Sequence, residues 1–170
     1  MVKQMSRLVI REETAEDIAA VFDVESAAFG RPDEARIVDA IRGTSEAVAS
    51  FVGVEQGRLV AHVFFSGVRI EGAPRVLAAG LGPVAVVPDR QGAGFGSALI
   101  RHGIDAIRAR FDLLVVLGNP RYYSRFGFEP AHPAGIEYQT PGFERAFQFM
   151  PLRGRVEARG RVVYSPAFGS

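Results

Sequence analysis

Three glycines stand within five residues in the segment VVPDRQGAGFGSAL, which runs from Val86 to Leu99. The segment follows an apolar run and precedes a helix-like pattern, so it joins a strand to a helix. Such a turn presents free N–H groups at the positive end of a helix dipole, and glycine lacks the Cβ that would hold a ligand away. This chemistry favours an anion, and a pyrophosphate in particular.

Side chains beside the glycines fit the same chemistry. Gln91 contributes an amide, Arg90 a positive charge and Ser97 a hydroxyl group. A sharp turn packed tightly on a neighbouring element would also need glycines, so a purely structural interpretation stays open at this point.

Two other phosphate-binding motifs do not fit the segment. A P-loop requires a lysine directly after its last glycine, and Lys3 is the only lysine of the chain. A dinucleotide-binding fingerprint requires an acidic residue at the end of the next strand, where this sequence has Asn119. Binding of ATP or NAD by either route is therefore disfavoured.

Two motifs together resemble those of the GCN5-related N-acetyltransferase (GNAT) superfamily, and of its YhbS-like branch in particular. Gln91-x-x-Gly94-x-Gly96 after an apolar strand is similar to the family's acetyl-CoA signature. The run YSRFGF, beginning at Tyr123, is similar to its second hallmark, a tyrosine four residues before a Gly-Phe pair. The resemblance is close over residues 81–131 and looser towards both ends of the chain.

The resemblance implies a fold. It is an α/β mixed sheet, mostly antiparallel with one parallel splayed pair of strands, flanked by helices. In such enzymes the pantetheine arm of acetyl-CoA fills the gap between the splayed strands as if it were another strand. Backbone groups of Val84, Ala85 and Val86 would bond to the pantetheine, and Pro83, which lacks an N–H, would help to end normal pairing.

The resemblance also implies the cofactor contacts. Asn119 would touch the pantetheine, Tyr123 would lie beside the sulfur, and Arg125 would lie near the nucleotide end. The pyrophosphate would be surrounded by seven consecutive residues, Gln91, Gly92, Ala93, Gly94, Phe95, Gly96 and Ser97.

The implied reaction is acetyl transfer from acetyl-CoA to a primary amine of a small molecule or peptide, by direct attack in a ternary complex. The Val86 N–H would stabilise the tetrahedral oxyanion. Tyr123 would protonate the departing thiolate, since a phenol pKa of about 10 and a thiol pKa of about 8.5 allow the proton to be shared.

The general base is missing from this interpretation, because residues 76–87 contain no Asp, Glu or His. His62 is flanked by apolar residues and is more typical of a satisfied, half-buried histidine than of a base. Glu25 falls on the apolar stripe of the first helix, from which it could reach a substrate groove or turn to solvent, and the second outcome is expected. A second hypothesis therefore stays open, a non-catalytic acyl-CoA-binding sensor or regulatory module.

The hydrophobic pattern predicts the elements that position these residues. A capping box at Thr14 begins a first helix, whose apolar stripe includes Phe29. The other expected elements are a strand at 7–11, a helix at 33–42, a hairpin from 47 to 70, a strand at 76–87, a helix after the glycines, a strand at 113–118, a short helix from 120 to 127, and strands in RAFQFMPL and RVVYSPAF.

Length and composition predict a single domain over 1–170, with a core at about 7–131 and a C-terminal strand and tail at 132–170. The net charge of +1 disfavours nucleic acid as a partner, and no stretch is long and apolar enough for a signal peptide or a membrane span. The absence of cysteine and the spacing of His102 and His132 predict no metal site. We expect a cytoplasmic protein, monomeric or homodimeric.

Overall fold

In the computed structural model, residues 7–169 are described. Within this part of the chain nine strands form one sheet in the order β1-β2-β3-β4-β5-β8-β6, with β9 paired to β3 and β7 paired to β9. The strands are β1 (Leu8–Glu12), β2 (Ala47–Glu55), β3 (Arg58–Ile70), β4 (Ala78–Val86), β5 (Leu113–Leu117), β6 (Glu129–Pro130), β7 (Ile136–Tyr138), β8 (Phe147–Pro151) and β9 (Gly160–Val163). The α-helices are α1 (Ile18–Phe29), α2 (Asp33–Ile41), α3 (Phe95–Ile107) and α4 (Pro120–Tyr123).

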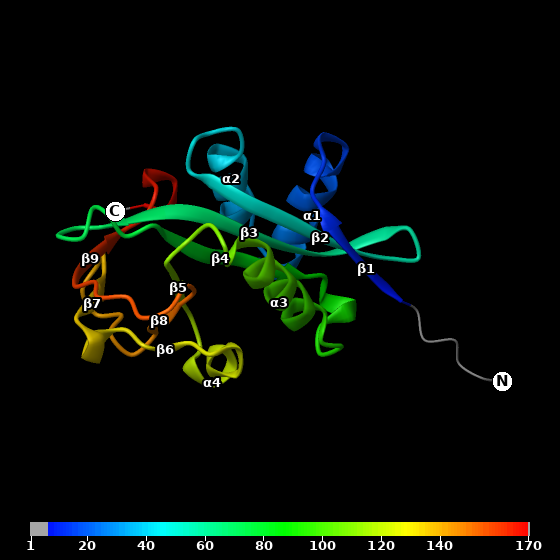
Figure 1. Ribbon diagram of the computed structural model, residues 1–170. Helices are drawn as coiled ribbons and strands as arrows, with labels where there is room; N and C mark the ends of the chain where they lie inside the picture. The colour runs from blue at the N-terminus through cyan, green and yellow to red at the C-terminus, as the bar shows by residue number, and fades with distance from the viewer. Residues whose placement is uncertain (1–6, 170) are drawn as a thin grey trace.

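The sheet is mostly antiparallel, and β4 and β5 form a parallel pair within it. Figure 1 shows α3 on one side of the sheet and α1 with α2 on the other. This arrangement confirms the predicted fold class. A second parallel pair, between β7 and β9, was not anticipated by the sequence pattern.

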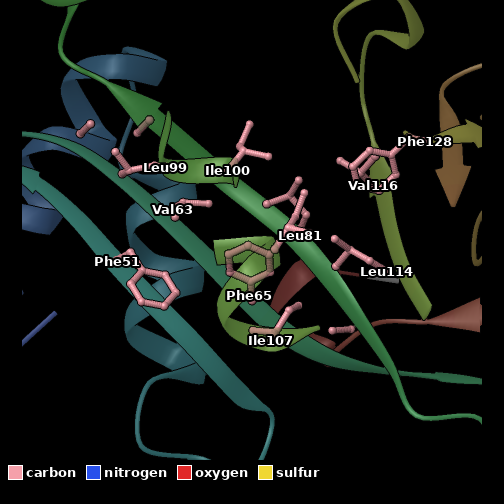
Figure 2. Packing of buried hydrophobic residues seen from close by; sticks show 14 of the residues in the cluster. Phe51, Val63, Phe65, Leu81, Leu99, Ile100, Ile107, Leu114, Val116 and Phe128 are labelled. Carbon is pink, nitrogen blue, oxygen red and sulfur yellow. The ribbon is translucent and has the colours of Figure 1, made fainter. Parts of the chain in front are cut away.

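The largest apolar cluster lies where α3 packs on the sheet (Figure 2). Gly103 permits this close approach, because a Cβ at that position would lie 2.3 Å from the ring of Phe65. Phe65 is itself fully buried among residues of β4, β5 and α3. A smaller cluster joins α1 and α2 to the other face of the sheet, through Val21, Val38 and Phe64.

The first helix begins as predicted, and its predicted apolar stripe is buried in part. The Thr14 N–H donates to Asp17 Oδ2 at 2.7 Å, and a 3-10 turn precedes the α-helix. Phe29, expected on the apolar stripe, is 41% exposed. It is the last residue of α1, directly before Gly30, whose φ of 69° ends the helix. The buried positions of α1 are Val21 and Glu25, which belong to the predicted stripe, and Val24, which does not.

Both strands predicted in the C-terminal tail are present. β8 lies between β5 and β6, and β9 pairs antiparallel with the last residues of β3. No helix in residues 7–169 is long and apolar enough to cross a membrane. The start of the segment predicted to lack a targeting signal, residues 1–6, lies outside the described residues.

Candidate active site

A gap opens in the sheet where β4 and β5 part. Their parallel pairing ends at Gly80 and Val115. β4 continues to Val86 and β5 to Leu117, and in the described residues no further pair joins them. The facing backbone edges of the two strands are therefore not paired with each other over this stretch, which confirms the predicted splayed pair.

The register between β3 and β4 decides which backbone groups face the gap. The Val87 N–H donates to the Val60 carbonyl at 2.9 Å. Because backbone groups of successive residues in a strand point to opposite sides, Val84 and Val86 turn away from β3 and towards the gap. Ala85 turns its backbone towards β3. The prediction that Ala85 offers backbone groups to the gap therefore does not fit the register.

The glycine turn is open to its surroundings. Gly92 and Gly94 have φ values of 81° and 84°, in the left-handed region that favours glycine. A Cβ added at either residue would meet no described atom within 4 Å. Tight packing on a neighbour is therefore not the reason for these two glycines. The backbone conformation requires them, and the space above them is free.

The turn ends at the first residues of α3. Gly94 is the N-cap residue, and the Ala98 N–H donates to its carbonyl at 3.0 Å. The N–H groups of Phe95, Gly96 and Ser97 precede that bond and have no partner within the helix. Several amides at the positive end of a thirteen-residue helix thus face the open turn.

Two side-chain hydrogen bonds tie the turn to the elements around the gap. Gln91 Nε2 donates to the Val86 carbonyl at 3.0 Å. Ser97 Oγ and the Tyr122 hydroxyl share a hydrogen bond of 3.0 Å. The first bond holds the turn against β4 and the second joins α3 to α4, so both walls of the candidate site are fixed to the same turn.

Two arginines flank this region. Arg90 Nη2 donates to Glu55 Oε2 at 2.6 Å, and its guanidinium carbon lies 5.0 Å from the centre of the Phe95 ring. Arg125 is exposed and lies 5.5 Å from the centre of the Tyr122 ring. Both contacts are with aromatic side chains of the elements that border the turn, where a phosphate would meet positive charge.

Tyr123 is held against the end of β5. A Cβ at Gly118 would lie 2.5 Å from Tyr123 Cε2, so the missing side chain makes room for the ring. Burial raises the pKa of Tyr123 to about 12. The ordinary phenol pKa assumed from the sequence is therefore too low, and the hydroxyl is neutral and a hydrogen-bond donor at neutral pH.

Asn119 begins α4. Its Oδ1 accepts a hydrogen bond from the Arg121 N–H at 3.0 Å, and Pro120 occupies the first helical position. The short helix passes into a 3-10 turn that ends at Gly127, with a φ of 102°. Asn119 thus lies at the end of β5, on the wall of the gap, with its side-chain oxygen engaged as a cap.

The expectation that Glu25 turns to solvent is wrong. His62, which was expected to be half-buried with its hydrogen bonds satisfied, is fully buried. Glu25 is fully buried, and its Oε1 lies 2.6 Å from His62 Nδ1. His62 is also fully buried, and its Nε2 lies 2.8 Å from Ser50 Oγ. The histidine is satisfied on both ring nitrogens. Glu25 does not turn to solvent because α1 presses this face against β3 and β4.

The sequence interpretation missed Gly118 and Ser50. The only signal for Gly118 was its place directly after the strand, and Ser50 carried none, because its partner His62 is on the neighbouring strand. In residues 7–169 no group of three His, Cys, Asp or Glu side chains is arranged to hold a metal ion.

A sheet that opens beside the N-terminus of a helix, with a glycine turn between them, is the architecture of an acyltransferase that uses coenzyme A. Residues 9–131 match the family described as Acetyltransferase (GNAT) domain. The chain belongs to the GNAT family of N-acetyltransferases, which confirms the resemblance seen in the sequence.

Relatives and solved structures agree with this assignment. YhbS of Escherichia coli K12 is 30% identical over 143 residues, 83% of this chain and 85% of YhbS. YjhQ of the same organism is 36% identical over 118 residues, 67% of this chain and 65% of YjhQ. Both are described as uncharacterized N-acetyltransferases.

Two similar crystal structures hold a coenzyme. E. coli YhbS in complex with CoA has a TM-score of 0.90 and 28% identity, covering 100% of this chain and 96% of that one. A GNAT family acetyltransferase from Brucella melitensis in complex with acetyl-CoA has a TM-score of 0.81 and 36% identity, covering 96% and 99%. The fold is therefore one that binds CoA or acetyl-CoA in two other proteins.

Proposed function

We propose that this protein transfers the acetyl group of acetyl-CoA to a primary amine of a small molecule or peptide. The observation that carries the proposal is the parting of β4 from β5 beside the open glycine turn. The gap offers free strand edges to an extended amide-bearing arm, and the turn offers amides to a pyrophosphate. The acetyl-CoA bound by the B. melitensis protein has both parts.

The residues predicted from the sequence keep their roles in the proposal, with changes at Val86, Ala85 and Tyr123. Val84 faces the gap and would bond to the pantetheine, whereas Ala85 contributes only packing. The Val86 carbonyl already accepts from Gln91, so Val86 offers only its N–H to the gap. Asn119 and Arg125 stay at the pantetheine and nucleotide ends. The pyrophosphate would be held by Gln91, Gly92, Ala93, Gly94, Phe95, Gly96 and Ser97.

In the proposed reaction a neutral amine attacks the thioester carbon in a ternary complex. Negative charge develops on the carbonyl oxygen, and the Val86 N–H, which faces the gap, would donate to it. The C–N bond forms and the C–S bond breaks. The products are the acetylated amine and the thiolate of CoA, which must receive a proton.

Tyr123 would stabilise that thiolate by hydrogen bonding. Its pKa of about 12 lies well above the value of about 8.5 for a thiol, so the phenol does not give its proton up completely. A donated hydrogen bond to the leaving sulfur lowers the barrier without requiring this unfavourable transfer. The proton that finally resides on sulfur would then come from the attacking amine.

A calorimetric titration with acetyl-CoA, with ATP and NAD as controls, tests the proposal. Micromolar binding of acetyl-CoA alone is expected. Gly92→Ala should weaken it about tenfold, because the new Cβ stands in the open space above the turn. Gly43→Ala is the matched control, since Gly43 has the same φ of 81° and equal free space but lies at the end of α2. Equal effects of the two variants, or equal binding of all three ligands, would exclude the cradle.

Turnover is tested by Tyr123→Phe, measured as thiol release with a panel of primary amines. We expect kcat to fall about 100-fold while acetyl-CoA affinity stays within twofold. Gly118→Ala should lower kcat in the same direction by displacing the ring. Gly67→Ala is its control, because a Cβ there lies no closer than 3.7 Å to its neighbours. An unchanged kcat in Tyr123→Phe would remove the tyrosine from the mechanism.

We further propose a cytoplasmic location, a single domain over 1–170, and a monomeric or homodimeric state. The acceptor is a primary amine.

A further inference from the structure

Acetyl transfer to an amine needs a proton acceptor, and β4 does not supply one. A primary alkyl amine has a pKa of about 10.4 and is mostly an ammonium ion at neutral pH, which cannot attack a thioester. β4, from Ala78 to Val86, contains no titratable side chain. If the proposed function holds, the acceptor must come from a neighbouring element.

One buried chain of polar side chains lies on the face of the sheet opposite α3. It joins Glu25 of α1, His62 of β3 and Ser50 of β2, through contacts of 2.6 and 2.8 Å. Glu25 and His62 have no exposed surface, whereas Ser50 is partly exposed. This chain of hydrogen-bonded side chains thus runs from Ser50, at the surface of the molecule, to Glu25 in its interior.

The inner end of this chain is close to the gap in the sheet. His62 pairs directly with Ala85, the residue between the two valines whose backbone faces the gap. α1 packs on both β3 and β4. Val24, the residue before Glu25, belongs to the same apolar cluster as Ala85. Glu25 therefore lies on the side of β4 that α3 leaves uncovered.

The inner end is also unsatisfied. Glu25 Oε2 is buried and has no hydrogen-bond partner in residues 7–169. A buried carboxylate oxygen without a donor is costly, because its lost hydration is not replaced. This unpartnered oxygen indicates a place for a water molecule or for a proton-bearing ligand.

The surrounding charges set the affinity of this carboxyl for a proton. Burial raises the pKa of Glu25, the negative charge of Glu34 on α2 adds to the effect, and His62 opposes it. Glu34 is itself paired with Arg31. A carboxyl with a raised pKa is a better proton acceptor near neutral pH than an ordinary one.

We propose that Glu25 accepts the proton of the incoming ammonium through a water molecule at Oε2, and that His62 and Ser50 are positioning residues that hold the carboxyl in place. The neutral amine then attacks, the C–N bond forms and the C–S bond breaks. The second amine proton goes to the thiolate, giving CoA with a free thiol. The proton on Glu25 returns to solvent, so one ammonium and one acetyl-CoA give one amide, one CoA and one proton.

The test is the pH dependence of kcat/KM for Glu25→Gln, with lysine, an alanyl peptide and 1,4-diaminobutane as amine probes. At neutral pH we expect a loss of about 100-fold. The loss should shrink to a few-fold near pH 10, at about the pKa of the amine, where the amine no longer needs a base. A merely structural role would lower kcat/KM equally at every pH, and that result would overturn the proposal.

Two further variants keep the test decisive. Glu137→Gln alters the exposed Glu–His pair and should leave the whole profile unchanged. Should Glu25→Gln not fold, Ser50→Ala retains Glu25 and His62 and should lower kcat/KM about threefold at neutral pH only. If Ser50→Ala then had the wild-type kcat/KM at neutral pH, or lost the same factor at every pH, the proposed proton transfer through Glu25 would be overturned. Wild-type protein that does not bind acetyl-CoA would overturn the proposed function itself, whereas normal wild-type turnover with an unchanged Glu25→Gln profile overturns only the role of Glu25.

Discussion

Two glutamate–histidine pairs in this protein have the same geometry and opposite surroundings. In each, a glutamate Oε1 lies 2.6 Å from a histidine Nδ1. The side chains of Glu25 and His62 are 0% exposed, whereas those of Glu137 and His132 are 41% and 59% exposed. The contact distance is therefore no guide to what a pair contributes, because the removal of water decides its energetics.

The two pairs also differ in how they are assembled. His132 and Glu137 are five residues apart and meet within one turn and the strand that follows it. Glu25 and His62 are 37 residues apart and meet only because α1 packs on β3. A buried pair is a weak source of stability, so its presence on the face of β4 opposite α3 fits a role in proton transfer better than a role in folding.

The largest expected effect comes from breaking the buried pair. His62→Ala leaves Glu25 buried without its partner and should lower the free energy of unfolding by about 3–5 kcal/mol, measured by urea denaturation. His132→Ala is the matched change in the exposed pair and should cost less than about 0.5 kcal/mol. A loss below about 1 kcal/mol in His62→Ala would show that the two pairs are energetically alike.

The pH dependence of stability should separate the pairs next. Because burial raises the pKa of Glu25, the folded state holds this proton more tightly than the unfolded chain does. Its contribution is fully present below the unfolded pKa and is lost as pH rises through the folded pKa. Glu25→Gln should therefore gain stability relative to wild type as pH rises above the ordinary glutamate pKa of about 4.3. Urea midpoints at several pH values measure this, and a constant difference would contradict it.

A smaller effect is expected at the outer end of the buried chain. Ser50→Ala removes the partner of His62 Nε2 and should cost about 1–2 kcal/mol in urea unfolding. Ser124→Ala provides a comparison, because the Ser124 hydroxyl donates to the Arg121 carbonyl in an exposed turn. Equal losses would show that the third member adds nothing to the buried pair.

The smallest effect belongs to the exposed pair. Glu137→Gln should change the free energy of unfolding by less than about 0.5 kcal/mol, and added salt should abolish even that. The measurement is urea unfolding at low and high ionic strength. A larger, salt-resistant loss would mean that the pair contributes more than its exposure suggests.

Some features of the candidate site are likewise set by neighbours in the sequence, and others by contacts between distant elements. The glycine turn, the helix that follows it and the start of the short helix at Pro120 were all predicted, because turn conformations and helix starts are set by neighbouring residues. The orientation of Ala85 was not, since it depends on the register between β3 and β4. The raised pKa of Tyr123 likewise depends on what surrounds the ring.

The order of the elements, the open turn before α3 and the family were all predictable from the amino-acid sequence, because hydrophobic periodicity and short motifs are properties of adjacent residues. The burial of Glu25 depends instead on the packing of distant elements. In the sequence it stands on the apolar stripe of α1 with no visible partner, and we expected it in solvent. The packing of three separate elements removed its water and placed His62 beside it, and desolvation of that kind is a property of the assembled core.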